Sequence, residues 1–469
     1  MVGRVLVTYS NWSNHVSTTA DYLHSISRYS RFDVHYAHVT SGAVLDFDLN
    51  DFDVIFQNYC ARLIFDGYVG ADYLEKLKSF RGLKLIAVQD EYDRTERLRQ
   101  AIRDIGYHVV LSVVPPAMLQ RIYPPEMFPG TEFLSVLTGY VPERLARRGD
   151  VRPIADRPVT IGYRGREIGA RYGRLGFEKF EIGRRMREIC EARGIPHDIA
   201  WSDDKRIYGD AWYDFLGSCR ATLGSESGSN VFDFDGSVEA KYAELSAARD
   251  GPVPFEEFRA HTDPYETRFD MAQISPRVFE AAALRTPMVL YTGGYSGLIE
   301  PGEHYIELKK DFSNVDAVLD RLSDTAGLEQ MAERAYCRLV GSGEFSYARF
   351  IQLIGDTIDR RAAELGLALR PAAEIAASGA TAEAASHLRE LPTRVPNDPV
   401  VFLYKFYSAE IARLNRVISD LHGRLTAPAP PQVAAVQQLR QLLPEWVVWV
   451  LRKLVRPLAR WPGRTSGAP

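Results

Sequence analysis

The sequence predicts an α/β protein in which two Rossmann-like domains face each other across a cleft, with a C-terminal helical tail. Short apolar runs alternate with helical patterns from residue 4 to about 140. The alternation restarts after a stretch rich in proline and arginine, VPERLARRGDVRPIADRP. Such alternation indicates parallel βαβ units with right-handed crossovers. The length of 469 residues is also too great for a single core.

The elements follow in order along both predicted domains. Strands are expected at RVLVTY, FDVHYAHV, FDVIFQN, LKLIAVQD, HVVLSVV and EFLSVL, and then at VTIGY, DIAWS, RATLGS and MVLYT. An interruption rich in Asp, Gly and Pro is expected to form a loop or short helices over the cleft. The predicted organisation is an N-terminal acceptor domain (1–141), a linker (142–158), a C-terminal donor domain (159–350) with the insertion at about 230–272, a helical segment (351–425), and a Pro-rich linker with a basic amphipathic tail (426–469).

Composition narrows the class of protein. A net charge of −4 gives no global reason to expect nucleic acid as a partner, and we predict none. The four cysteines form no CxxC pair, so neither a zinc site nor a disulfide framework is indicated. The opening MVGRVLVTYS leads directly into a strand and does not look like a signal peptide. We therefore expect a cytoplasmic protein.

Residues 275–294, SPRVFEAAALRTPMVLYTGG, predict a helix followed by a buried strand. Ser275 is a natural N-cap and Pro276 suits the first helical position, while the residue before Pro287 is held out of helical geometry. Gly293 and Gly294 would allow the backbone to approach a ligand closely at the carboxyl end of the strand.

The string VFEAAALRTPMVLYTGGYSGLIEPGEHYIEL resembles the donor-side signature of the group 1 glycosyltransferases of GT-B fold, which include glycosyltransferase family 4. The resemblance covers residues 158–350 well and the N-terminal half in outline. The string AWYDFLGSCRATLGSESGSNVFDFDG is similar to a sub-group of cell-surface polysaccharide transferases. The family pattern is matched by Glu280, Pro287, Gly293, Gly294, Glu300 and Gly302.

The resemblance implies a nucleoside-diphosphate sugar as donor, and the residue types suit one. Glu280 is the candidate that accepts the ribose hydroxyls, although such an acid can also merely complement the helix dipole. Arg166 and Arg171 resemble the paired basic residues that neutralise the departing diphosphate, although a solvated basic loop would have the same composition. The expected donor-binding residues are Gly165, Glu280, Gly293, Gly294 and Glu300.

Three departures affect the part of the site that would hold the sugar. The family places a first glutamate eight positions before the second, where this chain has Ala272. Glu226 in GSESG is the candidate replacement, with Asp270 as its rival. Arg285 stands where the family often has a glycine that ends the helix. The retaining or inverting outcome therefore stays open.

The acceptor side is expected at loops that follow strands of the N-terminal half. His15, in the loop after the first strand, is a candidate general base or acceptor contact, or else a capping residue. Asp90, Glu91 and Asp93 follow LKLIAVQ at its carboxyl end, where open α/β sheets bind ligands. Asp233 and Asp235 are too few for a dedicated metal site, so we expect no metal and no cofactor besides the donor.

These features predict a glycosyltransferase that uses a nucleotide sugar and transfers the sugar to a glycan or lipid-linked glycan, with domain closure during the reaction. A GT-B-fold nucleotide-sugar 2-epimerase and a non-catalytic binding scaffold are the alternatives. Residues 440–469 carry six basic side chains against one acid, with tryptophans at 446, 449 and 461. This pattern predicts either a helix at the inner membrane surface or a helix packed on the donor domain.

Overall fold

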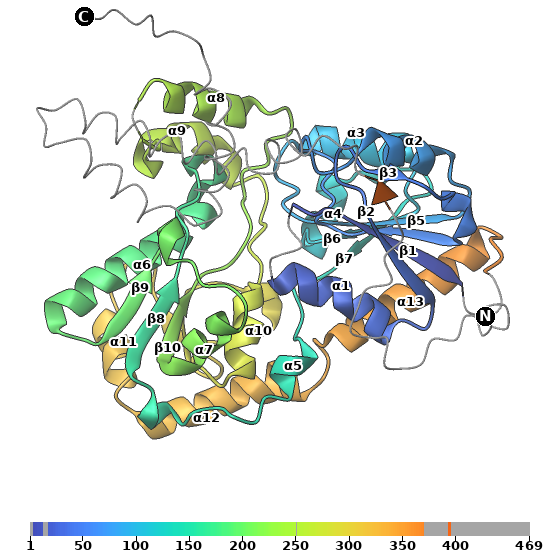
Figure 1. Ribbon diagram of the computed structural model, residues 1–469. Coiled ribbons are helices and arrows are strands. Elements are labelled where there is room, and N and C mark those ends of the chain that lie inside the picture. Colours follow the sequence, from blue (N-terminus) through green and yellow to red (C-terminus); the bar gives the residue numbers. More distant parts are fainter. Residues whose placement is uncertain (1–2, 13–16, 250, 370–392, 395–469) are drawn as a thin grey trace, which may run out of the picture. The chain divides into compact units, whose positions relative to one another are not determined.

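The N-terminal half of the chain is built around the first of two parallel sheets (Figure 1). The computed structural model describes residues 3–12, 17–249, 251–369 and 393–394, so the predicted tail and most of the helical segment before it lie outside the described residues. The sheet has six parallel strands in the order β2-β1-β4-β5-β6-β7. They are β1 (Arg4–Tyr9), β2 (Asp33–His38), β4 (Val54–Gln57), β5 (Leu83–Val88), β6 (Val109–Ser112) and β7 (Glu132–Ser135).

Helices cover both faces of this sheet. Leu85 of β5 packs into the core formed with α1 and α13, and the next residue, Ile86, packs into the core formed with α2 and α3. Successive strand residues point to opposite faces, so a strand covered on both sides is apolar throughout. The helices are α1 (Ser17–Tyr29), α2 (Ala71–Ser79), α3 (Thr95–Ile105), α4 (Pro116–Ile122) and α13 (Tyr347–Glu364). A short strand β3 (Val44–Leu45) pairs antiparallel with β13 (Thr393–Arg394).

Helix α13 comes late in the sequence but belongs to the first half, as Figure 1 shows in orange beside α1. The ring of Phe350 stacks on that of Tyr140 with 4.2 Å between ring centroids. On the surface, Arg31 pairs with Asp356 at 2.9 Å and with Asp359. The chain therefore crosses from the first half to the second and returns.

The second sheet has five parallel strands in the order β12-β11-β10-β8-β9. They are β8 (Val159–Arg164), β9 (His197–Ala200), β10 (Cys219–Gly224), β11 (Met288–Tyr291) and β12 (Ile306–Leu308). Its helices are α5 (Glu143–Ala146), α6 (Gly173–Arg193), α7 (Asp210–Ser218), α8 (Ser237–Ala247), α9 (Phe255–Glu266), α10 (Pro276–Ala283), α11 (Val315–Arg321) and α12 (Thr325–Tyr336). The predicted α/β architecture with two parallel sheets is confirmed.

The predicted insertion at 230–272 contains α8 and α9, and its two ends reach the first half. Phe232 and Met271 are fully buried in a core cluster of the N-terminal sheet. Thr95 N–H donates to Asp233 O at 3.1 Å, and Asp233 N–H donates to Tyr92 O at 2.8 Å. The insertion therefore joins the two halves through apolar packing and backbone hydrogen bonds.

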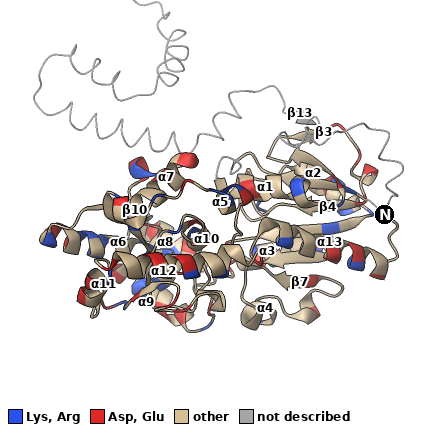
Figure 2. Cartoon of the chain, turned by 90° about the horizontal axis from the view of Figure 1, so that it is seen from below, with Lys and Arg blue, Asp and Glu red and all other residues tan. Residues whose placement is uncertain are grey.

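Charged side chains of both signs are interspersed along the outer helices, as Figure 2 shows for α12 and α13. Within the described ranges, no helix combines the length and the apolar character needed to cross a bilayer.

Candidate functional site

A cavity of about 680 Å³ lies between the two halves of the described chain. Gly165 follows β8 and Ser225 follows β10, and both line it from the second half. Thr18 and Asp90 line it from the first half. The cavity thus lies at the carboxyl ends of parallel strands, where such sheets bind ligands. Two Rossmann-like halves about a shared cleft constitute the GT-B arrangement, so the predicted fold class is confirmed.

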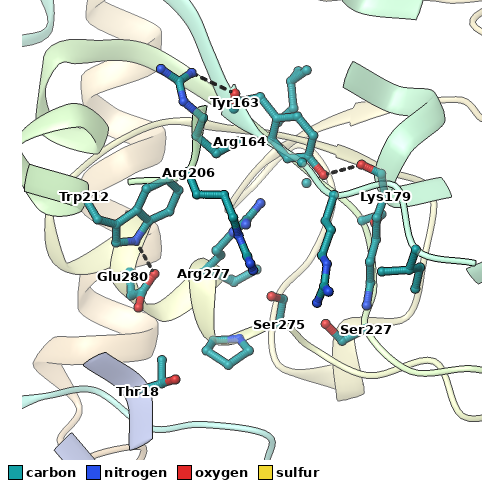
Figure 3. Close-up of a pocket in the computed structure, with 18 of the residues that line it drawn as sticks. Thr18, Tyr163, Arg164, Lys179, Arg206, Trp212, Ser227, Ser275, Arg277 and Glu280 are labelled. Carbon is teal, nitrogen blue, oxygen red and sulfur yellow. Dashed lines mark hydrogen bonds between the residues drawn. The ribbon is translucent and has the colours of Figure 1, made fainter. Parts of the chain in front are cut away.

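Glu280 is a buried wall residue of this cleft. Helix α10 begins at Pro276 after Ser275, as the sequence predicts, and Glu280 is one turn further on. Its side chain accepts a hydrogen bond from Trp212 Nε1 at 2.8 Å (Figure 3). Burial raises the pKa of Glu280, while the Trp212 N–H and the charge of Arg277 act in the opposite direction. At 6% exposure, Glu280 is not a solvated acid that only complements a helix dipole.

Three cations line the same cleft without an ion pair in the described part of the chain: Arg166, Lys179 and Arg277. Figure 3 shows Lys179 and Arg277 on the wall that also carries Glu280. The pKa of Lys179 is lowered to about 8, mainly by burial; the nearby charge of Asp90 opposes this shift, and the charges of Arg277 and Arg166 add to it. Like charges converge here, which favours an anionic ligand.

Lys179 and Arg277 were not among the residues predicted from the sequence. Arg277 lies inside the stretch 275–294, directly after Ser-Pro. Its position on the first turn of α10 is the one feature of the sequence that could have indicated a residue of the cleft. Lys179 lies on α6, where the Tyr163 hydroxyl donates to the Lys179 carbonyl oxygen at 2.8 Å. A Cβ at Gly165 would lie 2.9 Å from that carbonyl, so the glycine allows α6 to approach the end of β8 closely.

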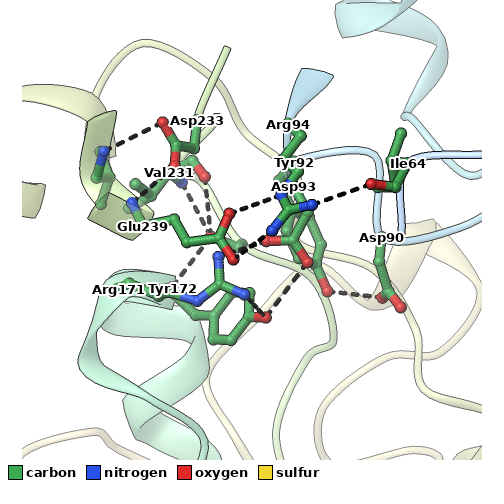
Figure 4. Close-up of polar contacts among 12 residues, drawn as sticks. Ile64, Asp90, Tyr92, Asp93, Arg94, Arg171, Tyr172, Val231, Asp233 and Glu239 are labelled. Atoms are coloured by element: carbon green, nitrogen blue, oxygen red, sulfur yellow. Dashed lines mark hydrogen bonds and ion pairs between the residues drawn. The ribbon is translucent and has the colours of Figure 1, made fainter. Parts of the chain in front are cut away.

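Arg171, the second predicted diphosphate ligand, does not line the cleft. Its Nη1 lies 2.7 Å from Asp93 Oδ1, and its Nη2 donates to the Tyr172 hydroxyl. Figure 4 shows this pair beside a second one in which Arg94 contacts both oxygens of Glu239, at 2.7 and 3.1 Å. Both ion pairs connect the first half to the second. Of the predicted basic pair, the structure thus places Arg166 in the cleft and Arg171 in a contact between the halves.

Glu226 lies behind the Gly-Gly loop and does not line the cleft. Its Oε1 accepts hydrogen bonds from Gly294 N–H at 3.1 Å and from Tyr295 N–H at 2.7 Å. A Cβ on Gly293 would lie 2.5 Å from Glu226 Oε2. The group that approaches the backbone of this loop closely is therefore Glu226. Neither Gly293 nor Gly294 lines the cavity.

Three other predicted residues lie outside the cleft lining. Glu300 is exposed in the turn before β12, and its N–H donates to His304 Nδ1 at 3.0 Å. Asp270, the rival of Glu226, is exposed and accepts from Ala272 N–H at 3.2 Å. Arg285 adopts a left-handed backbone with φ 47°, which accounts for the glycine that the family often has there.

Asp233 has a structural role, because it accepts hydrogen bonds from Val238 and Glu239 N–H at the start of α8. Asp235 accepts from Ser237 N–H at 3.0 Å. In the part of the chain that the structure describes, no three His, Cys, Asp or Glu side chains gather in a way that could hold a metal ion.

On the acceptor side, Asp90 and Asp93 line the cleft, whereas Glu91 is fully buried beneath it. Glu91 accepts hydrogen bonds from Ser112 Oγ at 2.6 Å, Tyr123 Oη at 2.7 Å and Val113 N at 3.0 Å. Burial raises the pKa of Glu91 to about 7 despite these donors. His15 lies outside the described residues.

No protein-family model matches this chain, and no curated protein matches it in sequence. Among solved structures it is similar to an alpha-glucosyltransferase in complex with UDP-glucose and DNA containing an abasic site, at 12% identity and a TM-score of 0.48, with 76% of this chain and 100% of that chain covered. Anabaena HepE in complex with UDP and glucose follows at 10% identity, TM-score 0.44 and coverage of 76% and 100%. Sucrose-phosphate synthase from Thermosynechococcus elongatus matches at 12% identity, TM-score 0.39 and coverage of 77% and 100%.

Proposed function

We propose that this protein is a glycosyltransferase that binds a nucleoside-diphosphate sugar in the cleft and transfers the sugar to a glycan or lipid-linked glycan. The observation that carries the proposal is a set of three cations, Arg166, Lys179 and Arg277, beside the buried carboxylate of Glu280. They line one wall of the cleft and have no ion pair with any residue that the structure describes. A diphosphate needs cationic donors, and a ribose diol needs an acceptor that can take two hydroxyl protons. Both chemistries occur within one cavity.

The three cations would act most strongly on the leaving group. When the bond between the sugar and the diphosphate breaks, negative charge grows on the diphosphate, and fixed cations stabilise that charge more than they stabilise the bound donor. Lys179, with a pKa of about 8, is mainly protonated at pH 7, and an adjacent diphosphate would favour its charged form further. Arg166, Lys179 and Arg277 are therefore the proposed leaving-group residues.

Glu280 is the proposed ribose ligand. Its carboxylate is held by the indole N–H of Trp212, which leaves the other oxygen available to a hydroxyl in the cleft. Burial makes each such hydrogen bond stronger than it would be in water. Glu226 is proposed to act indirectly, because it fixes the loop at Gly294 and Tyr295 and does not line the cavity.

A panel of donors tests the proposal. The purified protein is offered UDP-, GDP- and dTDP-sugars with and without a membrane extract from the source cells, and released nucleoside diphosphate and converted sugar are measured. Diphosphate release that depends on the extract supports a transferase. Interconversion of the sugar without an acceptor would indicate the 2-epimerase, and binding without turnover a non-catalytic scaffold. Failure of every donor to bind would remove the proposal.

The finer assignments have their own tests. A role in cell-surface polysaccharide synthesis predicts that loss of the protein changes the capsule or surface glycan. The similar alpha-glucosyltransferase is in complex with DNA, whereas we predict no nucleic-acid partner for this chain. A short DNA therefore belongs in the acceptor panel.

Attachment to the inner membrane surface rests on the composition of residues 440–469, which lie outside the described residues. Full-length protein should co-sediment with anionic vesicles more strongly than a chain that ends near residue 425, and the difference should shrink at high salt. Equal sedimentation of the two proteins at low salt would contradict the assignment.

A further inference from the structure

The two walls of the cleft differ in electrostatic character. Arg166, Lys179 and Arg277 on the second half have no ion pair within the described ranges. On the first half, the cation that lines the cleft, Arg62, is paired with Asp90 at 2.6 Å. We infer that the acceptor is an uncharged sugar whose hydroxyls bind the Arg62–Asp90 pair, and that phosphate groups are bound only on the opposite wall. This inference rests on the proposed function.

The Arg62–Asp90 pair has the chemistry that a sugar diol needs. Asp90 Oδ2 is bonded to Arg62 Nη2, and Asp90 Oδ1 accepts from the Tyr92 hydroxyl at 2.7 Å. The side chains of Arg62 and Asp90 stay 27% and 36% exposed toward the cleft, so both can make additional bonds. A carboxylate accepts from hydroxyls and a guanidinium donates to them, and adjacent sugar hydroxyls use both at once.

The backbone at Asp90 supports a role beyond packing. Its φ is 55°, in the left-handed region that residues other than glycine rarely occupy. Such positions cost free energy and gather at functional sites. Asp90 lines the cavity from the first half, whereas Lys179 of the proposed diphosphate wall lines it from the second half. A hydroxyl bound at Asp90 would therefore lie on the opposite side of the cavity from the leaving group.

The charge balance of the cleft wall on the first half argues against an anionic acceptor. Asp93, the other carboxylate that lines it, is neutralised by Arg171 at 2.7 Å. The aromatic side chains of Phe65 and Tyr92 complete the wall and suit the apolar C–H faces of a sugar ring. A nucleic acid or a lipid phosphate bound at this wall would instead require unpaired Lys or Arg side chains. Among the described cleft residues, unpaired Lys and Arg side chains lie on the proposed diphosphate wall of the second half.

The test measures acceptor binding separately from donor binding. The full-length protein, saturated with UDP, is titrated with three classes of probe: neutral oligosaccharides such as cellotriose, maltotriose and chitotriose together with a printed neutral glycan array, phosphorylated or sulfated counterparts, and a short single-stranded DNA. Neutral glycans should bind, with an affinity that changes less than twofold between about 50 mM and about 200 mM salt. Anionic probes should bind at least tenfold more weakly.

Asp90→Asn and Arg62→Met should each lower the affinity for the neutral glycan that binds the unaltered protein by tenfold or more. The affinity for UDP should fall by a smaller factor. Arg97→Gln is the matched control, because Arg97 pairs with Asp66 on the same half outside the cleft, and it should change neither affinity. Preferred binding of DNA or phosphorylated glycans, a steep salt dependence, or no glycan bound at all would overturn the inference. Failure of the unaltered protein to bind any of UDP, GDP and dTDP would instead overturn the proposed function.

Discussion

Arg171 Nη1 lies 2.7 Å from Asp93 Oδ1, and this ion pair joins the two halves beside the cleft. The side chains are only 15% and 5% exposed. Burial raises the pKa of Asp93, and the charge of Arg171 opposes that shift. Together with Arg94 and Glu239, the pair connects the insertion and the start of α6 to the loop after β5. The relative position of the halves therefore depends on Arg171, which the sequence pattern assigned to the donor diphosphate, and on Asp93, which it assigned to the acceptor side.

Replacement of Arg171 by Met should destabilise the protein by about 3–5 kcal/mol, because the buried carboxylate of Asp93 loses its counter-charge. The double variant Arg171→Met, Asp93→Leu should recover part of that loss in urea unfolding experiments. Arg97→Met is the control, since its exposed pair with Asp66 should be worth less than about 1 kcal/mol. Equal losses for Arg171→Met and Arg97→Met would show that the inter-domain pair adds nothing special.

Glu280→Gln should weaken UDP binding by about tenfold, because a neutral amide cannot make the charge-assisted bonds that a carboxylate makes to a ribose diol. Glu300→Gln is the matched control from the same sequence pattern, since Glu300 is exposed and outside the cleft. Calorimetric titration of both variants measures the effect. If Glu280→Gln binds UDP as tightly as Glu300→Gln does, Glu280 is not a donor ligand.

Gly293→Ala should cost about 1–3 kcal/mol, because the new Cβ would lie 2.5 Å from Glu226 Oε2 and the loop would have to move. Gly294→Ala should be nearly neutral, since the closest atom to its added Cβ is 3.9 Å away and its backbone is right-handed, with φ −91°. Thermal and chemical unfolding of the two variants give the comparison. Similar losses at both positions would contradict the packing argument.

The pKa of Glu91, raised by burial to about 7, makes stability depend on pH. The folded state holds this proton more tightly than the unfolded state does, so stability should fall by up to about 3 kcal/mol as the pH rises from about 4.5 to about 7. Glu91→Gln removes the titration, so the stability gap between wild type and variant should move in favour of the variant over this range. A gap that moves in favour of the wild type as the pH rises would contradict the assignment.

The sequence predicts the α/β fold well because its strands are buried on both faces and read as continuous apolar runs. The sequence also predicts that Glu280 lies near the cleft, because a helix start, a proline and a buried strand fix where that side chain lies. The role of Arg171 could not be read in the same way, since its partner Asp93 is 78 positions away and lies in the other half. Lys179 was missed because a lysine on a helix gives no local sign that it faces a cleft.

The Gly-Gly loop shows a further limit. A pair of glycines after a strand indicates that some group approaches the backbone closely, but the pattern does not say which group. Here Glu226 approaches Gly293, because β10 and β11 are neighbours in the sheet and bring the two loops together. Sheet order, which places Glu226 beside a segment nearly 70 residues away, is not visible in local sequence patterns.

The most direct test of the central claim is calorimetric titration of UDP, GDP and dTDP into wild-type protein and into Lys179→Met, with Lys309→Met as control. Lys309 lies on the same half but is exposed and outside the cleft. The wild type should bind at least one of these nucleotides, Lys179→Met should bind it at least tenfold more weakly at pH 7, and Lys309→Met should bind it as the wild type does. Equal affinity of all three proteins for every nucleotide, or no binding to the wild type, would contradict a nucleotide site in this cleft.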